Sequence, residues 1–390
     1  MSSNTTIVII GASYSGMQVA QSILKQIPVA KVVLVNPTTK VFYNIAAPRI
    51  FAKPSAIAPE KYFLPIEKEF ERYSSSSFEF VHGIATSIDT EGKTVSVKEG
   101  SESRVVAYDY LVIASGSTSP STVGKSGIVA PFKSTDSEDL DATVKKTQDA
   151  ITSAKSIIIG GAGPVGVEFA GEIGEASSEA TEKKEITLVS ATKQLLPMLK
   201  PSAGAAAEKI LKSKGVKVLA SRRVEKAEHD PATNKWFVTL DGDEVVQADI
   251  YVSTTGVIPN NKFIPPEFLT SDGWVEVDNG FRVKGNAGSD DKAASPLPIY
   301  AIGDITCHSP RLLSRVASQT PVLVANLKAD ILKSGKRLAY TPRKDIMMVV
   351  PVGKWTGTGQ ISGFVLWGYF VSFIKGRDFF VPKAPSFITA

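Results

Sequence analysis

Two short glycine-rich turns have the spacing that binds the pyrophosphate of a dinucleotide. The first, residues 11–16 (GASYSG), follows the apolar run 7–10. Gly11 permits a tight turn, Gly16 allows the next helix to pack closely, and the helix N-terminus receives the phosphates. Serine replaces the middle glycine at Ser13, which leaves the phosphate less room than glycine would. We therefore expect a pyrophosphate site here.

The second turn, residues 161–166 (GAGPVG), matches the fingerprint completely and follows the apolar run 157–159. Gly161, Gly163 and Gly166 occupy its three glycine positions. One such fingerprint is a weak signal, whereas two of them in strand–turn–helix contexts are a strong one. The sequence therefore predicts two dinucleotide sites.

The position about 20 residues beyond each strand–turn junction normally holds an acidic residue that binds a ribose. Asn36 stands there in the first unit and can still hydrogen-bond a diol without a charge. Ser190 stands there in the second unit, close to Lys193. Because a carboxylate would repel the 2′-phosphate of NADPH, its absence predicts that NADH and NADPH are both accepted.

The elements that must position these turns alternate between strands and helices. Each turn is followed by a helical stretch and a second apolar run, at residues 32–35 and 186–189. Two further apolar strands, 108–116 and 248–256, end in small residues and mark crossings between domains. They close at Gly116 and Gly256. This pattern predicts an α/β fold with two Rossmann-like dinucleotide-binding domains.

Composition limits the kinds of chemistry. The chain has 390 residues and a net charge of +5 without a basic block, so no specific nucleic-acid partner is expected. Cys307 is its one cysteine, which excludes an intramolecular disulfide or dithiol, and with three histidines no metal site is predicted. Redox chemistry would therefore run on a bound cofactor. No secretory signal precedes the first strand, and Ser2 replaces the glycine needed for N-myristoylation.

The order of these motifs, ending in Ile-Gly-Asp at residues 302–304, resembles the flavoproteins with two dinucleotide-binding domains, such as glutathione reductase and the type II NADH:quinone oxidoreductases. The resemblance implies FAD on the first unit, NAD(P)H on the second, and contacts from Gly303 and Asp304 to the ribityl chain. Asp304 could alternatively be a helix cap or turn residue. The implied division is residues 1–118 and 254–340 for FAD, 119–253 for NAD(P)H, and 341–390 as a carboxy-terminal segment.

Disulfide reductases and peroxidases of this group need cysteine soon after the first unit, and Cys307 lies in the wrong segment. A small-molecule acceptor is therefore expected. His308 could approach the flavin, although an ordinary loop histidine is the simpler reading.

Four segments look like the ferroptosis suppressor, or AMID-type (apoptosis-inducing-factor-like), oxidoreductases: residues 42–49, 163–172, 357–364 and 375–381. The resemblance implies an enzyme that takes hydride from NADH or NADPH to flavin N5 and reduces a ubiquinone-like quinone at a membrane. Another acceptor, such as a secondary metabolite or a partner protein, is an alternative. A redox-sensing cell-death effector is a third.

The same resemblance suggests roles for individual side chains. Glu168 would hold the nicotinamide carboxamide or pair with a lysine near N5, with a helix-end charge as the alternative. Glu172 could instead be the solvated partner. Lys375 would stabilise negative charge near the quinone, or be an interfacial lysine. Arg49 would face FAD or its entrance, and Gln319 matches half of a quinone-contacting repeat.

The aromatic stretch 364–374 is too short to span a bilayer, which takes about 20 apolar residues. Four flanking cations suit an element lying in the headgroup region, with a core or dimer helix as the alternative: Lys354, Lys375, Arg377 and Lys383. We therefore expect a cytoplasmic monomer or homodimer, peripheral on a membrane such as the mitochondrial outer membrane or a lipid droplet.

Overall fold

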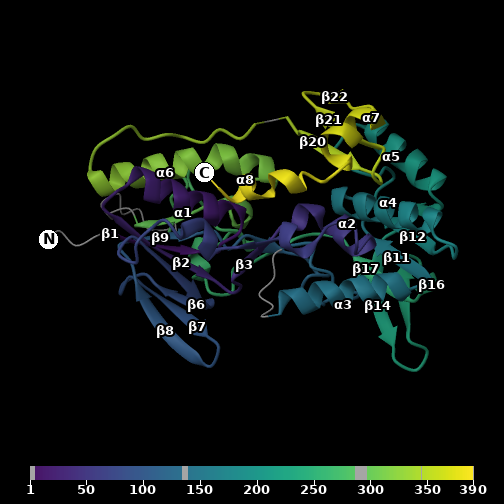
Figure 1. Ribbon diagram of the computed structural model, residues 1–390, viewed down its shortest axis with the longest axis horizontal. Helices are drawn as coiled ribbons and strands as arrows, with labels where there is room; N and C mark the ends of the chain where they lie inside the picture. Colours follow the sequence, from purple (N-terminus) through teal and green to yellow (C-terminus); the bar gives the residue numbers. More distant parts are fainter. Residues whose placement is uncertain (1–4, 134–138, 286–296, 344, 390) are drawn as a thin grey trace.

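The computed structural model describes residues 5–133, 139–285, 297–343 and 345–389, arranged as two lobes joined by a carboxy-terminal segment (Figure 1). Most of the polar loop expected near residues 284–298 lies outside the described residues. The predicted α/β class, with two Rossmann-like sheets, is confirmed.

The first lobe is built on a five-stranded parallel sheet in the order β19-β9-β1-β2-β5. Its strands are rich in buried β-branched residues, as expected for a sheet covered on both faces. Helices α1 (Tyr14–Gln26) and α6 (Leu313–Leu332) lie on one side, and the three-stranded sheet β6-β7-β8 on the other (Figure 1). The strands are β1 (Thr5–Ile10), β2 (Ala30–Asn36), β5 (Phe78–His82), β6 (Ile84–Asp89), β7 (Thr94–Glu99), β8 (Glu102–Ala107), β9 (Tyr110–Ile113) and β19 (Ile299–Ala301).

The second lobe repeats this plan with a parallel sheet in the order β13-β12-β11-β17. Helices α4 (Pro164–Glu179) and α5 (Pro201–Ser213) lie above this sheet in Figure 1, and α3 (Leu140–Ser153) lies below it. The strands are β11 (Ser156–Gly160), β12 (Glu185–Ser190), β13 (Val216–Ala220) and β17 (Ile250–Ser253), with an antiparallel sheet of β14 (Val224–Asp230), β15 (Lys235–Leu240) and β16 (Val245–Ala248).

Short elements connect the lobes. Helix α2 (Ala47–Ala52) packs on both α3 and α4, so it lies where the first lobe meets the second. Two small strand pairs complete this region, β3 (Lys40–Phe42) with β4 (Phe63–Pro65) and β10 (Ser117–Thr118) with β18 (Ile258–Pro259).

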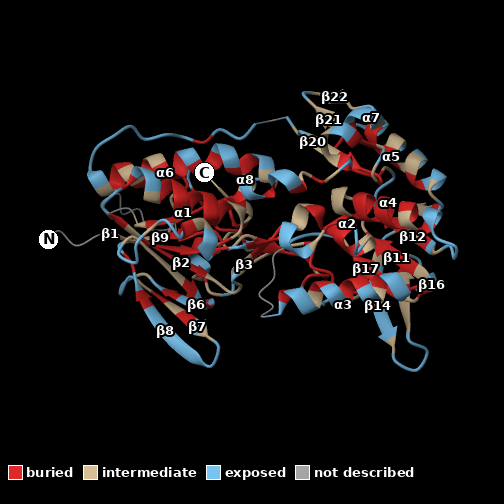
Figure 2. Cartoon of the chain, viewed as in Figure 1, coloured by how far each residue is buried: buried red, intermediate tan, exposed pale blue. Residues whose placement is uncertain are grey.

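The carboxy-terminal segment spans both lobes. Strand β20 packs on α4 and β21 on α5, whereas α8 packs on α1 of the first lobe. Its apolar side chains at Val371, Phe379, Ala384 and Ile388 are buried, and Figure 2 shows exposed positions beside them. Instead of the one element expected over 364–374, the chain forms β22 (Phe364–Val365), α7 (Gly368–Val371) and the start of a π-helical turn (Ser372–Gly376). The other elements of the segment are β20 (Met348–Pro351), β21 (Gly357–Ile361) and α8 (Ala384–Ile388).

Candidate active site

The first glycine turn joins β1 to α1 with no room for side chains. Gly11 has φ +105°, and a Cβ there would lie 2.5 Å from the carbonyl oxygen of Ala114. A Cβ on Gly16 would lie 1.7 Å from the carbonyl oxygen of Gly11. Ser13 immediately precedes α1, so its backbone stands at the positive end of the helix dipole. The turn therefore has the backbone form of a phosphate-binding loop.

The second turn joins β11 to α4 and repeats this geometry. Gly161 has φ +107°, and a Cβ on Gly166 would lie 1.9 Å from the Gly161 carbonyl oxygen. A Cβ on Gly163 would instead meet no atom within 4 Å. Glycine there leaves open space in front of the helix N-terminus, which is the space a pyrophosphate would fill. The residues present therefore fit a dinucleotide.

The two ribose-position side chains also shape their own loops. Asn36 accepts a hydrogen bond of 2.8 Å from the backbone N–H of Ala12 and donates one of 2.8 Å to the carbonyl of Thr38. Ser190 is buried and donates to the carbonyl of Thr192. These hydrogen bonds hold Asn36 and Ser190 beside their glycine turns. A contact of either side chain with a ribose stays a prediction.

Asp304 stands where a strand of the first sheet ends and accepts two hydrogen bonds on one oxygen. Ser117 Oγ donates at 3.1 Å, and Lys133 Nζ donates at 2.7 Å. Gly303, with φ +80°, packs on the first turn of α1, since a Cβ there would lie 2.3 Å from Ser15 Oγ. A quarter of the Asp304 side chain remains exposed, so the carboxylate can still meet a ligand. Lys133 had no motif to reveal it in the sequence.

Three glutamates form a buried acidic stripe along α4: Glu168, Glu172 and Glu175. Their spacing of four and three residues places them on one helix face. The first, Glu168, accepts a hydrogen bond of 2.6 Å from Lys375 Nζ. Burial raises the pKa of Glu168, and the Lys375 ammonium opposes that rise. This pair brings the two residues predicted to be catalytic into direct contact.

Glu172 was expected as a solvated alternative, and that expectation is wrong because its side chain is fully buried. Arg49 binds it through Nε at 2.9 Å and Nη2 at 2.7 Å. Arg49 Nη1 also donates to the carbonyl oxygen of Arg377 at 3.0 Å. The guanidinium therefore joins α2, α4 and the carboxy-terminal segment. The expectation that Arg49 also faces FAD or its entrance stays a prediction.

Glu175 ends the acidic stripe and binds cations from several elements. Lys53 of α2's end and Lys214 form ion pairs with it, the latter at 3.1 Å. The backbone N–H of Lys354 donates to both carboxylate oxygens. Although burial opposes ionisation, these donors lower the pKa of Glu175 below its usual value. Glu175 is therefore a structural anchor for the carboxy-terminal segment.

Other residues noted in the sequence lie in ordinary packing. His308 packs against Phe281 and Tyr340, with ring centroids 5.5 and 5.4 Å away, as a loop histidine would. Arg315 donates to the carbonyls of Arg343 and Asp345, tying down the strand-like connection ahead of β20. Gln319 is buried on α6, and its quinone contact stays a prediction.

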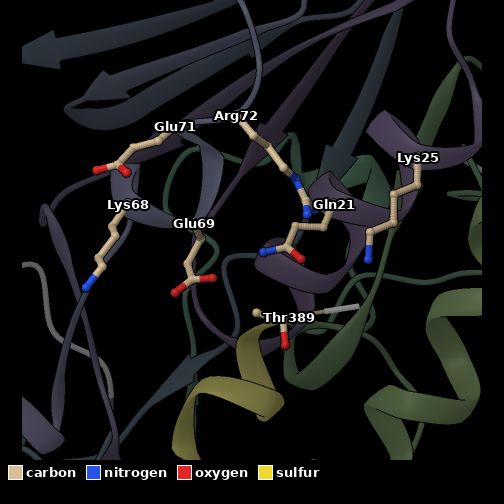
Figure 3. Close-up of a pocket in the computed structure, with 7 residues that line it drawn as sticks. All are labelled: Gln21, Lys25, Lys68, Glu69, Glu71, Arg72 and Thr389. Atoms are coloured by element: carbon tan, nitrogen blue, oxygen red, sulfur yellow. The ribbon is translucent and has the colours of Figure 1, made fainter.

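Two cavities lie outside the glycine turns. A cavity of about 700 Å³ is lined by Gln21 and Lys25 from the far end of α1 and by charged residues of the first lobe (Figure 3). It is two to three helical turns from the phosphate-binding end, so it is not the nucleotide site. A second cavity, of about 470 Å³, meets the acidic stripe through Arg49, and both charged and apolar side chains line it: Arg49, Glu60, Lys61, Arg377 and Asp378 among the charged ones, and Ile57, Leu64 and Val381 among the apolar ones.

The carboxy-terminal segment displays an aromatic surface, with side chains 51–79% exposed: Trp355, Phe364, Trp367, Tyr369, Phe370 and Phe373. Lys354 lies 4.7 Å from the Trp355 ring centroid, and Arg377 lies 6.0 Å from that of Phe373. Within the described residues, no helix is both long and apolar enough to cross a bilayer.

A family model described as pyridine nucleotide-disulphide oxidoreductase matches residues 5–324, which include both glycine turns and both parallel sheets. The chain belongs to this family. The family resemblance read from the sequence is thereby confirmed, as is an FAD-dependent enzyme that uses NAD(P)H. An intramolecular cysteine pair is excluded for this member, because its sequence has one cysteine.

Named relatives extend the similarity along almost the whole chain. Oxidoreductase ptaL of Pestalotiopsis fici is 37% identical, covering 97% of both chains. Oxidoreductase phnG of Penicillium herquei is 32% identical, covering 97% of this chain and 94% of its own. Human ferroptosis suppressor protein 1 is 26% identical, covering 96% and 93%.

Among solved structures, the sulfide:quinone oxidoreductase of Aquifex aeolicus shares the fold, with a TM-score of 0.76 at 16% identity. The match covers 98% of this chain and 92% of that one. The similarity therefore includes the carboxy-terminal segment, which the family model leaves out.

Proposed function

We propose that this oxidoreductase uses NADH or NADPH to reduce a ubiquinone-like quinone, with Glu168 and Lys375 at the reaction centre. The buried contact between these two side chains is the observation that supports the proposal most directly. It joins the helix that begins at the NAD(P)H turn to the carboxy-terminal segment. A cation held there by a carboxylate would stabilise the negative charge that develops as bound FAD passes electrons to the quinone.

The cofactor and the protein divide the work. Bound FAD supplies the redox chemistry, because it takes two electrons from the nicotinamide and passes them to the acceptor. The turn at Gly11 would hold FAD, and the turn at Gly161 would hold NAD(P)H. Asp304, paired with Lys133, would contact FAD. Lys375 stabilises negative charge on a quinone oxygen and can donate a proton from Nζ. Glu168 holds that ammonium in place in a site with little water.

We further propose that the aromatic surface docks on a membrane. Exposed tryptophan, tyrosine and phenylalanine rings beside lysine and arginine suit the headgroup region, where rings enter the bilayer and cations meet anionic lipids. Docking would bring a lipid quinone to the carboxy-terminal side of the flavin. The cavity beside Arg49 is a candidate part of that path.

A second candidate keeps the chemistry and changes the acceptor to a soluble aromatic metabolite. It is supported by the higher identity to the two fungal oxidoreductases than to ferroptosis suppressor protein 1. An acceptor panel separates the candidates, because a lipid-quinone reductase turns over short-chain ubiquinones faster than oxygen or ferricyanide.

The direct test uses the purified holoprotein. It should be yellow, lose its visible absorbance when NADH or NADPH is added without oxygen, and regain it when a ubiquinone analogue follows. A protein that bleaches but is not reoxidised by any quinone would contradict quinone reduction while leaving the FAD-dependent activity intact.

A further inference from the structure

The buried ring of Phe379 contacts two cations, Arg49 and Lys375, each of which is paired with a glutamate of α4. Its centroid lies 4.6 Å from the Arg49 guanidinium carbon and 5.3 Å from Lys375 Nζ. Both distances fall within cation–π range. Phe379 therefore links the Arg49–Glu172 pair to the Lys375–Glu168 pair.

These contacts connect two neighbouring ion pairs on one face of α4 through a single aromatic ring. Glu168 and Glu172 are one helical turn apart, so they bring two cations together that would otherwise repel each other. The aromatic ring offers a negative face to both cations. Glu172 fixes Arg49 through two hydrogen bonds, and Arg49 in turn contacts the ring. The ring is thus held by Arg49 as well as by its own packing.

The backbone holds Phe379 as well. Its φ of +52° is a conformation that bulky residues rarely adopt. Its backbone N–H donates to the carbonyl of Lys375 at 2.7 Å, and its own carbonyl accepts from Tyr43 Oη at 3.0 Å. Tyr43 is fully buried in the first lobe. The first lobe therefore fixes the ring that faces the reaction centre.

We infer that Phe379 is a positioning residue, which holds the Lys375 ammonium on Glu168 through a ring anchored by Arg49. This inference rests on the proposed role of Lys375. The inference adds that the first lobe controls the position of the Lys375 ammonium through Phe379. Among the described residues, no side chain of the first lobe hydrogen-bonds Glu168. Phe379 acts on the reaction through Lys375 in this scheme.

The test replaces the Phe379 ring and measures how fast Lys375 is acetylated, because an ammonium that leaves Glu168 more often reacts faster. Phe379→Leu keeps an apolar side chain and removes the π face. Phe380→Leu is the matched control, because Phe380 also has positive φ and its ring contacts Phe387. Acetylation of Lys375 by acetic anhydride, followed by mass spectrometry of the holoprotein, should be roughly fivefold faster in Phe379→Leu and unchanged in Phe380→Leu.

Kinetics supply a second, independent reading. Phe379→Leu should lower quinone turnover roughly fivefold with little change in the KM for NADH, since the nucleotide turn is untouched. In a Lys375→Met background the same substitution should have no further effect, because its target is gone. If Phe379→Leu does not fold, Phe379→Met replaces it, since methionine fills irregular apolar space.

Unchanged acetylation of Lys375 in the ringless variant would overturn the inference. So would an equal loss of turnover in the Lys375→Met background, which would place the effect elsewhere. If Lys375→Met alone retains full turnover, Lys375 has no role in the reaction and that part of the proposed function fails. The acetylation rates in the Phe379 variants would still decide whether Phe379 positions Lys375.

Discussion

Lys375 and Glu168 are 207 residues apart in sequence, yet their side chains form a hydrogen bond of 2.6 Å in the interior of the protein. The contact joins the last folded segment to the helix that follows the NAD(P)H turn. It makes the carboxy-terminal segment a part of the reaction centre we propose.

Replacing Glu168 by glutamine should lower quinone turnover about 30- to 100-fold while FAD stays bound, because the ammonium loses its counter-charge. The pH profile gives a sharper reading. Burial raises the pKa of Glu168, so activity that needs the carboxylate should fall, as pH decreases, at a higher pH than the ordinary value of about 4.3. The raised value also means that protonation favours folding, a contribution that fades as pH rises through it. Steady-state rates from pH 4 to 8 test this, and a Glu168→Gln enzyme that keeps the wild-type acid limb would contradict it.

Replacing Arg49 by methionine should destabilise the protein by about 3–5 kcal/mol, because the fully buried Glu172 loses both Arg49 hydrogen bonds and keeps the longer ion pair with Lys53, at 3.5 Å. Urea unfolding measures this directly. The double variant Arg49→Met/Glu172→Leu should recover most of the loss. Lys145→Ala removes the exposed i,i+4 pair with Asp149 and serves as the control, with a cost of about 0.5 kcal/mol or less. A cost that small for Arg49→Met would show that the interior pair contributes little.

The middle and last glycines of the second turn should respond differently to alanine. A Cβ on Gly163 meets no protein atom, so Gly163→Ala should fold normally and raise the KM for NADH about tenfold by crowding the pyrophosphate. A Cβ on Gly166 would strike the Gly161 carbonyl, so Gly166→Ala should lower the yield of folded protein. Kinetics and circular dichroism of both variants check this. Normal NADH binding by Gly163→Ala would place the nucleotide elsewhere.

Membrane docking should depend on the aromatic surface alone. Deleting the whole carboxy-terminal segment would remove buried side chains and Lys375, so point changes are the better test. Trp367→Ser/Tyr369→Ser/Phe373→Ser should reduce flotation with anionic liposomes by at least about tenfold. The control replaces exposed valines of the antiparallel sheets, Val105→Ser/Val245→Ser. Equal flotation of both variants would remove the membrane proposal.

Local rules explain what the sequence could predict. Gly16 and Gly166 make their closest backbone contacts with Gly11 and Gly161, inside one strand–turn–helix unit, so the spacing is enough to identify the turns. Gly11 and Gly161 approach the distant residues Ala114 and Thr255, but their positive φ is a local property that already favours glycine. Glu168 and Lys375 were reached through family resemblance, because no local pattern relates residues so far apart.

The remaining site residues depend on tertiary packing. Glu172 lies on the same helix face as Glu168, but only the arrival of α2 against α4 turns it from a solvent-facing charge into the partner of Arg49. Lys133 meets Asp304 across 171 residues, from a loop with no motif. The aromatic stretch is too short for a span, as its length predicts, and its break into a strand, a helical turn and a π turn follows from packing on β20 and β21.

The position of Lys375 near the end of the chain has a consequence for biosynthesis. A ribosome finishes both nucleotide-binding lobes before it makes the cation at 375, and Phe379 and α8 come later still. Newly made chains can therefore begin to fold both lobes before the proposed cation exists, and a stop codon just before residue 375 would remove that cation together with the buried Phe379, Ala384 and Ile388.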